Sequence, residues 1–315
     1  CVTKWRTKCG TRCGTKWRTK CGTKCGTKRG TKWRTKCGTK RGTKWIIVLE
    51  LRCYRFDLPK KDSRFWLEPH GDHQIGSRLV DYDKIKERTT ALKKEPERHT
   101  IIMGDIIDNI TAYAGGAADK RWSPDVVDEE LKTPERQCDK FLSLYMPVKH
   151  KILGVLSGNH EWKTIDRYRF EKDFCRPLGV PYLGQMCMLN LQFYHKGEML
   201  RAFEIWAAHG AYAGMQPGGA VNRLKALAGQ YDADIYLTAH SHDKLWYTDH
   251  QVTHLTDTNE LGARPKVYVV TGTFQKSHIT GVDSYMEKRP QPRVSKVGTI
   301  TLELDPYNGK VHIFE

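Results

Sequence analysis

The sequence has no apolar run approaching the roughly 20 residues that a membrane-spanning helix needs. No apolar segment of the signal-peptide kind follows its basic N-terminus. Closely spaced cysteine pairs are also missing beyond residue 44, where Cys53, Cys138, Cys175 and Cys187 lie far apart. These absences argue against a membrane span, a signal peptide and a disulfide framework. We therefore expect a cytoplasmic protein in which these cysteines are reduced and which has no membrane partner.

Acidic residues are absent from residues 1–44, which carry 16 of the 53 Lys and Arg residues of the chain. The remaining residues have 37 basic against 36 acidic side chains. The net charge of +17 therefore describes the N-terminal segment, and the rest of the chain is close to neutral. A near-neutral body weakens an interpretation as a nucleic-acid-binding domain.

Threonine recurs at every fourth position from Thr3 to Thr43, in units such as TKWR, TKCG and TKRG. This composition cannot bury a core, and no solenoid has such a four-residue unit. We predict a disordered, basic, low-complexity tail or wrongly translated leader over residues 1–44 and one domain over residues 45–315. Two alternatives stay open for the tail. One is a nucleic-acid-binding arm with interleaved Trp, and the other is a zinc knuckle formed by Cys9, Cys13, Cys21 and Cys25.

The domain alternates apolar β-branched segments with segments of helical spacing, and its last third is rich in strands. This order predicts an α/β sandwich. The predicted strands are Ile46–Leu51, Arg64–Glu68, His99–Met103, Lys151–Leu156, Met186–Tyr194, Arg201–Ala208, Ile235–Thr238, Lys266–Val270 and Thr299–Leu304. The predicted helices are Asp83–Lys94, Glu129–Lys149 with a break near Pro134, Trp162–Phe174 and Val221–Ala228. Asn308-Gly309 is typical of a hairpin turn.

Polar side chains of types that bind metals follow five of the predicted strands. In open α/β sheets the carboxyl ends of the strands form the ligand crevice, so residues distant in sequence can meet at one rim. Buried acids at such places also need a partner, because their desolvation costs free energy. The five residues are Asp72, Asp105, Asn159, His209 and His240.

Five motifs follow one another in a fixed order at these strand ends. They are D-x-Q (72–74), G-D-x-x-D (104–108), G-N-H-E (158–161), H-G (209–210) and A-H-x-H (239–242). The ordered set resembles the calcineurin-like metallophosphoesterase superfamily, in the form of its compact phage-type and bacterial members, over residues 64–315. The resemblance implies two mixed β-sheets flanked by helices and a hydrolase acting on phosphomonoesters or phosphodiesters. It also implies attack by a hydroxide that bridges two divalent metal ions.

The resemblance assigns a role to each motif residue. Asp105 takes the place of the carboxylate shared by both ions, and His160 that of the catalytic histidine, which Asp108 would orient. The ligands implied for the first ion are Asp72, Gln74, Asp105 and His242. Those implied for the second ion are Asp105, Asn159, His209 and His240.

The chain departs from the superfamily pattern at two informative positions. Gln74 stands where the first motif has histidine, while His73 lies one place earlier. Either the amide of Gln74 binds the metal, or the loop shifts so that His73 does. We expect Mn, with Fe, Zn or Ni as alternatives, because the ligands are oxygen and nitrogen without thiolate. Asn109 stands where protein phosphatases of the superfamily have arginine, which argues against a phosphoprotein substrate.

Two other functions remain open at this stage. One is a nuclease of the same superfamily that acts on DNA or RNA, with the basic tail as a nucleic-acid contact. The other is a non-catalytic binding module that lost a metal through Gln74. The loops 112–125 and 211–220 are predicted to wall the crevice. The sequence does not specify the substrate or the oligomeric state.

Overall fold

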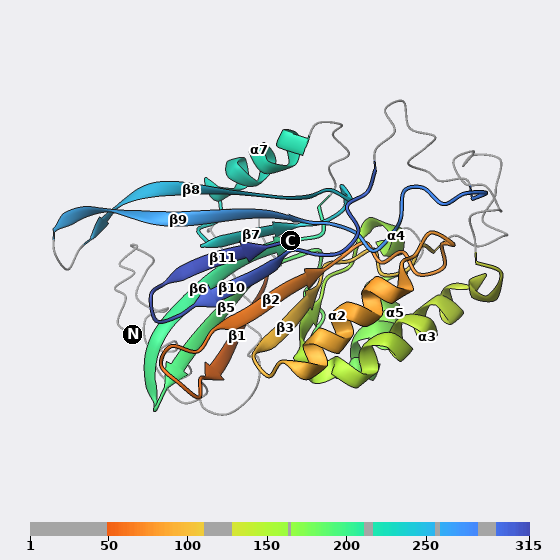
Figure 1. The fold of residues 1–315 in the computed structure, drawn as a ribbon, viewed down its shortest axis with the longest axis horizontal. Coiled ribbons are helices and arrows are strands. Elements are labelled where there is room, and N and C mark those ends of the chain that lie inside the picture. Colours follow the sequence, from red (N-terminus) through yellow and green to blue (C-terminus); the bar gives the residue numbers. More distant parts are fainter. Residues whose placement is uncertain (1–48, 110–127, 163–164, 211–216, 256–258, 283–293) are drawn as a thin grey trace, which may run out of the picture.

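The computed structural model describes residues 49–109, 128–162, 165–210, 217–255, 259–282 and 294–315. The repeat at residues 1–44 and the loop 112–125 therefore lie outside the described residues, as does most of the loop 211–220. Two mixed β-sheets form the centre of the structure (Figure 1). No helix in the described ranges is long and apolar enough to cross a membrane.

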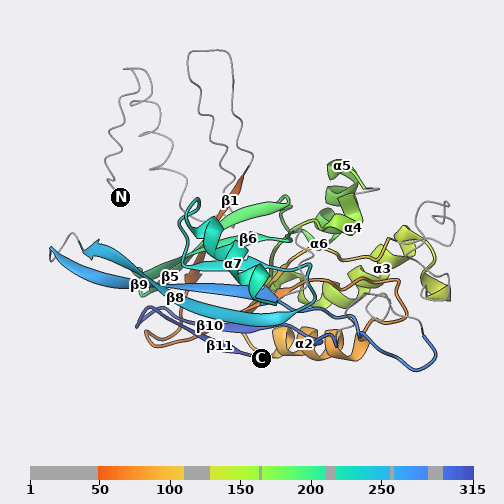
Figure 2. The ribbon, with the colours of Figure 1, turned by 90° about the horizontal axis from the view of Figure 1, so that it is seen from above.

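The larger sheet has six strands in the order β1-β5-β6-β7-β9-β8. Their bounds are β1 (Glu50–Asp57), β5 (Met186–His195), β6 (Glu198–Ala208), β7 (Ile235–Thr238), β8 (Lys244–Leu255) and β9 (Glu260–Thr271). The parallel pairs are β1–β5, β6–β7 and β7–β9. The hairpin of β8 and β9 extends past the rest of the sheet (Figures 1 and 2).

The smaller sheet has five strands in the order β11-β10-β2-β3-β4. Their bounds are β2 (Phe65–His70), β3 (Arg98–Ile102), β4 (Ile152–Val155), β10 (Thr301–Asp305) and β11 (Lys310–Phe314). β2, β3 and β4 are parallel neighbours, whereas β10 and β11 are antiparallel. The structure thus confirms the predicted α/β sandwich of two mixed sheets flanked by helices.

Helices cover the outer face of each sheet. The longer ones are α2 (Tyr82–Lys94), α3 (Pro134–Tyr145) and α7 (Pro217–Ala228). The short ones are η2 (Glu129–Leu131), η3 (Met146–Lys151), α4 (Asn159–Trp162), α5 (Arg167–Phe170), η4 (Glu171–Cys175) and α6 (Arg176–Leu178). α2 and α3 lie along the smaller sheet, and α7 lies against the larger one (Figures 1 and 2).

Apolar side chains fill the space between the sheets. Phe65 of β2 meets Phe193 of β5 at a centroid distance of 5.0 Å and Phe56 of β1 at 4.5 Å. Phe65 and Phe193 are fully buried, and burial of an aromatic side chain of this size stabilises a fold by several kcal/mol, of the order of 3–5 kcal/mol by truncation to alanine. Separate apolar clusters lie under α3 and under α7. This apolar packing therefore holds the two sheets face to face.

Several predicted elements differ from the structure, among them the strand predicted over 266–270, which runs over Glu260–Thr271. Residues 46–48 of the first predicted strand lie outside the described residues, and the described strand runs from Glu50 to Asp57, beyond the predicted end at Leu51, in parallel pairing with β5. The predicted helix 129–149 breaks near Pro134 as expected, and a second break near Pro147 divides it into three pieces. The predicted helix 162–174 is likewise divided, with a π-helical turn over Glu171–Cys175. None of these differences moves a strand end that carries a candidate site residue.

Candidate metal centre

Each motif lies just beyond the carboxyl end of a strand, as predicted. β2, β3 and β4 end before Asp72, Asp105 and Asn159, while β6 and β7 end before His209 and His240. β2 and β3 run toward the side of the molecule where α4 lies (Figure 1). The loops that follow these five strands therefore meet at one edge of the sandwich, which we call the rim.

The backbone of these loops is unusual for side chains larger than glycine. φ is positive at Asp72 (51°), Gln74 (48°) and Asp105 (47°), and also at His240 (70°) and His242 (59°). A left-handed conformation is disfavoured for residues with a Cβ and persists only where the surroundings impose it. Five of the seven predicted ligands thus share one strained conformation that turns their side chains toward the rim.

The first group of side chains is Asp72, Gln74 and His242. His242 Nε2 lies 3.4 Å from Asp72 Oδ1 and 3.0 Å from Gln74 Nε2. The backbone N–H of His240 donates to Asp72 Oδ2 at 2.8 Å. Asp72 Oδ1 is buried and has no hydrogen-bond partner among the described residues. A buried carboxylate oxygen in that state is the kind of atom that a cation satisfies.

The second group is Asp105, Asn159, His209 and His240. His209 Nε2 lies 3.2 Å from Asp105 Oδ2 and 3.1 Å from Asn159 Oδ1. Ligand atoms of Asp105, His209 and His240 all lie within 4.8 Å of one another. His209 Nδ1 lies 2.9 Å from the carbonyl oxygen of Met103, which leaves Nε2 facing the centre. The hydrogen bond from the backbone N–H of His240 to Asp72 connects this second group to the first.

His73 faces away from this rim, in contrast to Gln74. His73 is fully buried, its Nε2 lies 2.6 Å from the hydroxyl of Tyr145, and its ring stacks on Phe274. Of the two open alternatives, the loop conformation therefore favours Gln74. The oxygen and nitrogen of the Gln74 amide exchange places on a 180° rotation of the amide group. This rotation would place Oε1 beside His242 Nε2, where it could bind a metal.

His160 lies beside the second group, and Asp108 lies behind it. His160 Nδ1 lies 2.8 Å from the carbonyl oxygen of Asp108 and 3.4 Å from Asp108 Oδ1, and Nε2 lies 3.8 Å from Asp105 Oδ2. Burial by itself lowers the pKa of His160, but the carboxylates of Asp105 and Asp108 outweigh it and raise the pKa to about 10. Burial raises the pKa of Asp108.

The charges of the central residues are strongly coupled. Burial of Asp105 would raise its pKa, but His209 and His160 hold that pKa well below its usual range. Burial would lower the pKa of His209, but Asp105 reverses this effect and raises it to about 9. Burial lowers the pKa of His240. Asp105, which follows β3, is thus an anion paired with the imidazoles of His209 and His160.

Glu161 holds the two central loops together, a role that the sequence analysis did not assign. Its carboxylate accepts hydrogen bonds from the backbone N–H groups of Asp105, Ile106, Ile107 and Gly158, three of them between 2.8 and 3.2 Å and the shortest at 2.6 Å. Its position in the G-N-H-E motif was the only signal. Burial and the nearby Asp105 raise the pKa of Glu161 to about 7.

The donor set fits divalent cations. It combines carboxylate and amide oxygens with imidazole nitrogens, and it contains no thiolate, a combination that suits Mn, Fe, Zn or Ni. The ring Nδ1 atoms of His240 and His242 have no hydrogen-bond partner among the described residues, so these two rings are less firmly oriented than that of His209. The backbone N–H of Gln74 donates to the carbonyl oxygen of Asp105 at 3.0 Å, which connects the loops of the two groups.

No family model matches the chain, and no curated protein is similar in sequence. A metallophosphoesterase from Sphaerobacter thermophilus is similar in structure, with 12% identity and a TM-score of 0.36 over 80% of this chain and 89% of that one. Vps29 from Entamoeba histolytica, complexed with Zn²⁺, has 13% identity and a TM-score of 0.35 over 79% and 97%. A predicted phosphoesterase from Streptococcus pneumoniae has 13% identity and a TM-score of 0.33 over 80% and 98%.

TM-scores this low carry no argument by themselves. The structure has the two mixed β-sheets flanked by helices that the resemblance implies, with the five ordered motifs each just beyond the end of a strand. The Nδ2 of Asn109, the residue next to Asp108, donates a hydrogen bond to the carbonyl oxygen of His160 at 2.7 Å.

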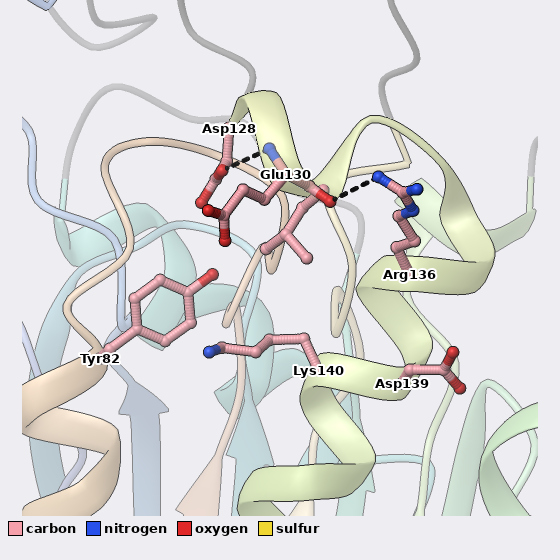
Figure 3. Close-up of a pocket in the computed structure, with 7 residues that line it drawn as sticks. Tyr82, Asp128, Glu130, Arg136, Asp139 and Lys140 are labelled. Atoms are coloured by element: carbon pink, nitrogen blue, oxygen red, sulfur yellow. Dashed lines mark hydrogen bonds between the residues drawn. The ribbon is translucent and has the colours of Figure 1, made fainter.

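A separate surface pocket lies between α2, η2 and α3 (Figure 3). Lys140 Nζ lies 5.1 Å from the ring centroid of Tyr82, and Asp128 accepts a hydrogen bond from the backbone N–H of Glu130. The pocket contains none of the predicted site residues. Its charges have both signs and favour no single class of ligand. This pocket is therefore separate from the candidate metal centre.

Proposed function

We propose that this protein is a metal-dependent phosphoesterase that hydrolyses a phosphomonoester or phosphodiester. The observation that carries the proposal is the meeting of two carboxylates, two amides and three imidazoles at the ends of strands from both sheets. When bound, a pair of divalent ions would supply the Lewis acidity that activates water and binds phosphate oxygens. Manganese is the metal we favour, because the amide of Gln74 is a harder ligand than the imidazole it replaces.

In this proposal the side chains of the two groups hold the ions, and Asp105 is shared between them. The first ion would be held by Asp72, Gln74, Asp105 and His242, and the second by Asp105, Asn159, His209 and His240. Glu161 keeps the loops of Asp105 and Asn159 at a fixed separation through its four backbone hydrogen bonds.

His160 would act on the substrate itself. Its Nδ1 faces Asp108, so that Nε2 is the nitrogen on the side of the rim. A protonated Nε2 donates a hydrogen bond to a phosphate oxygen and transfers its proton to the leaving oxygen. Asp108 orients the ring and stabilises its positive charge, which is the task of a positioning residue.

Metal analysis and a substrate panel test the proposed function. We expect the purified full chain to take up two equivalents of Mn²⁺ and to hydrolyse p-nitrophenyl phosphate or bis-p-nitrophenyl phosphate. Preference between these two separates a monoesterase from a diesterase. Uptake of metal without turnover of either ester would favour a non-catalytic binding module. Salt-sensitive cleavage of DNA or RNA that weakens on removal of residues 1–44 would favour the nuclease alternative.

The variant His160→Gln tests the role of the proposed catalytic histidine. We expect kcat to fall by about 10²–10⁴-fold, the usual contribution of general acid catalysis, because glutamine cannot transfer a proton. Metal content should stay at the wild-type level, since His160 is not one of the proposed ligands. His312→Gln is the control, as His312 is exposed on β11. Equal turnover of His160→Gln and wild type would contradict the assigned role.

A further inference from the structure

A chain of buried polar side chains runs beneath the proposed metal centre. His70 Nε2 lies 3.0 Å from Glu68 Oε2, and His70 Nδ1 lies 2.8 Å from the hydroxyl of Tyr145. The same hydroxyl lies 2.6 Å from Nε2 of His73. All four residues are fully buried. None of them is a proposed ligand, and the proposed hydrolysis does not use them.

Glu68, at the outer end of this row of hydrogen-bonded side chains, is held in place by ion pairs. Glu68 pairs with Arg98 and, at 3.5 Å, with Arg88, and it accepts a hydrogen bond from Thr301. With His70 Nε2–H donating to Glu68, the Tyr145 hydroxyl donates to His70 Nδ1 and accepts from His73 Nε2–H. Every hydrogen of this network then has an acceptor, and His73 Nδ1 is the one ring nitrogen of the two histidines without a hydrogen-bond partner among the described residues. The hydrogen bonds made in this buried, low-dielectric environment hold the side chains in one arrangement.

The inner end of the chain is the loop that carries Asp72 and Gln74. His73 lies between them, and its ring is held by Tyr145 and by stacking on Phe274 at 4.9 Å. The backbone N–H groups of Asp72 and Gln74 donate to the carbonyl oxygens of Gly104 and Asp105, at 3.1 and 3.0 Å. With the ring of His73 fixed on the inner side, its two neighbours are held in their left-handed conformation, facing the rim.

We propose that Tyr145 and His73 are positioning residues that select Gln74, rather than His73, as the ligand at the first metal position. The hydrogen bond between the Tyr145 hydroxyl and His73 Nε2, which we call the tether, keeps the imidazole of His73 away from that position. It also fixes the direction of Asp72. The first position is therefore weaker than the second and depends on the tether, whereas the position formed by Asp105, His209 and His240 does not. This inference rests on the proposed metal centre.

Hydrogen exchange in the metal-free protein tests the tether without reference to metal or activity. Tyr145→Phe keeps the ring and removes the shared hydroxyl. We expect faster exchange of the amides of Gln74 and Ile75, whose partners are Asp105 and Ile106. Tyr236→Phe is the matched control, because Tyr236 is equally buried and its hydroxyl also makes two hydrogen bonds, under α7. Equal exchange in this loop in the two variants would overturn the proposal.

Titration with Co²⁺, followed by its visible absorption, tests the consequence for metal binding. In Tyr145→Phe we expect the more weakly bound equivalent to lose about 10- to 100-fold in affinity, the usual effect of losing an outer hydrogen-bond partner of a ligand. The tighter equivalent should keep its wild-type affinity and spectrum. His73→Phe should act in the same direction, since phenylalanine preserves the stacking on Phe274 but not the tether.

Retention of both wild-type affinities in Tyr145→Phe and His73→Phe would overturn the proposal. An equal loss at both equivalents would also overturn it, because that result indicates general destabilisation of the rim. A wild-type protein that binds only one Co²⁺ would instead contradict the proposed two-ion centre. In that case the exchange comparison still decides whether Tyr145 positions the loop.

Discussion

Individual residues at the rim combine strained backbone with very close packing. The loops of Asp105 and Asn159 approach so closely that glycine is required at their contact. A Cβ on Gly104 would lie 2.6 Å from the backbone nitrogen of Gly158, and a Cβ on Gly158 would lie 2.1 Å from Asp105 Oδ1. Real Cβ atoms do not come this close to backbone or to a fixed carboxylate. The two glycines therefore let a carboxylate at a strand end lie directly against the next loop.

Gly158→Ala should damage the metal centre through this contact. The added methyl group must displace the carboxylate or the backbone of Asp105, because both lie within 2.3 Å of it. We expect loss of at least one metal equivalent and a decrease in the free energy of unfolding of about 1–3 kcal/mol, the usual cost of overpacking. Metal analysis and urea unfolding measure the two effects.

Gly218→Ala is the matched control for this substitution, since Gly218 has no neighbouring atom within 4 Å of an added Cβ. It should bind metal as the wild type does. A Gly158→Ala protein with full metal content would show that the loops can separate, contrary to the packing described above.

At the scale of elements, the rim is supported by segments that carry no candidate ligand. Phe274 donates its backbone N–H to the carbonyl oxygen of Asp72 at 3.1 Å, and the hydroxyl of Thr273 donates to the same oxygen at 2.9 Å. The carbonyl oxygen of Phe274 accepts a hydrogen bond from the N–H of Asp81, the N-cap of α2. Helix α2 is thereby connected to the loop of Asp72 through the segment that follows β9.

Asp81→Ala tests this connection. Asp81 Oδ1 accepts a hydrogen bond from the N–H of Lys84 at 3.0 Å, and Oδ2 lies 3.1 Å from Lys276 Nζ. Loss of an N-cap costs about 1 kcal/mol of stability, and the lost pairing with Lys276 adds to it. We expect a lower free energy of unfolding, measured in urea. Asp83→Ala, in the exposed first turn of the same helix, should change it by less than half as much.

At the scale of the whole molecule, stability depends on a buried charge in the smaller sheet, that of Glu68 on β2. Burial would raise the pKa of Glu68, but His70, Arg98 and Arg88 outweigh it and lower the pKa to about 2. A carboxyl group with a depressed folded-state pKa stabilises the protein fully above its unfolded pKa, near 4.3. This contribution is lost as the pH falls through that value toward about 2.

Glu68→Gln should therefore remove part of the acid sensitivity of the fold. Each unit of pKa shift corresponds to about 1.4 kcal/mol, so the contribution is of the order of 3 kcal/mol at neutral pH. We expect the variant to be less stable than wild type at pH 7 and the difference to shrink steadily between pH 5 and pH 2. Urea unfolding at a series of pH values measures this. A difference that does not depend on pH would show that Glu68 is not ionised in the folded protein.

The local sequence determined the strands and the residues at their ends. Apolar β-branched runs followed by Gly104-Asp105 or by Gly158-Asn159 indicate buried strands that end in polar turns, and the structure has both strands. The break near Pro134 was predicted, but the second break near Pro147 and the π-helical turn over Glu171–Cys175 were not. Strand β1 extends beyond its predicted end at Leu51, in pairing with β5, more than 100 residues away.

The sequence by itself determined which residue types stand at the rim, because each motif is a local pattern at a strand end. Only the tertiary structure decided how they meet. It turned Gln74 toward His242 and His73 toward Tyr145, a choice between adjacent residues that no local pattern contains. It also brought Glu161 against four backbone N–H groups. Both results depend on hydrogen bonds between segments distant in the chain, and these exist only after the two sheets have packed together.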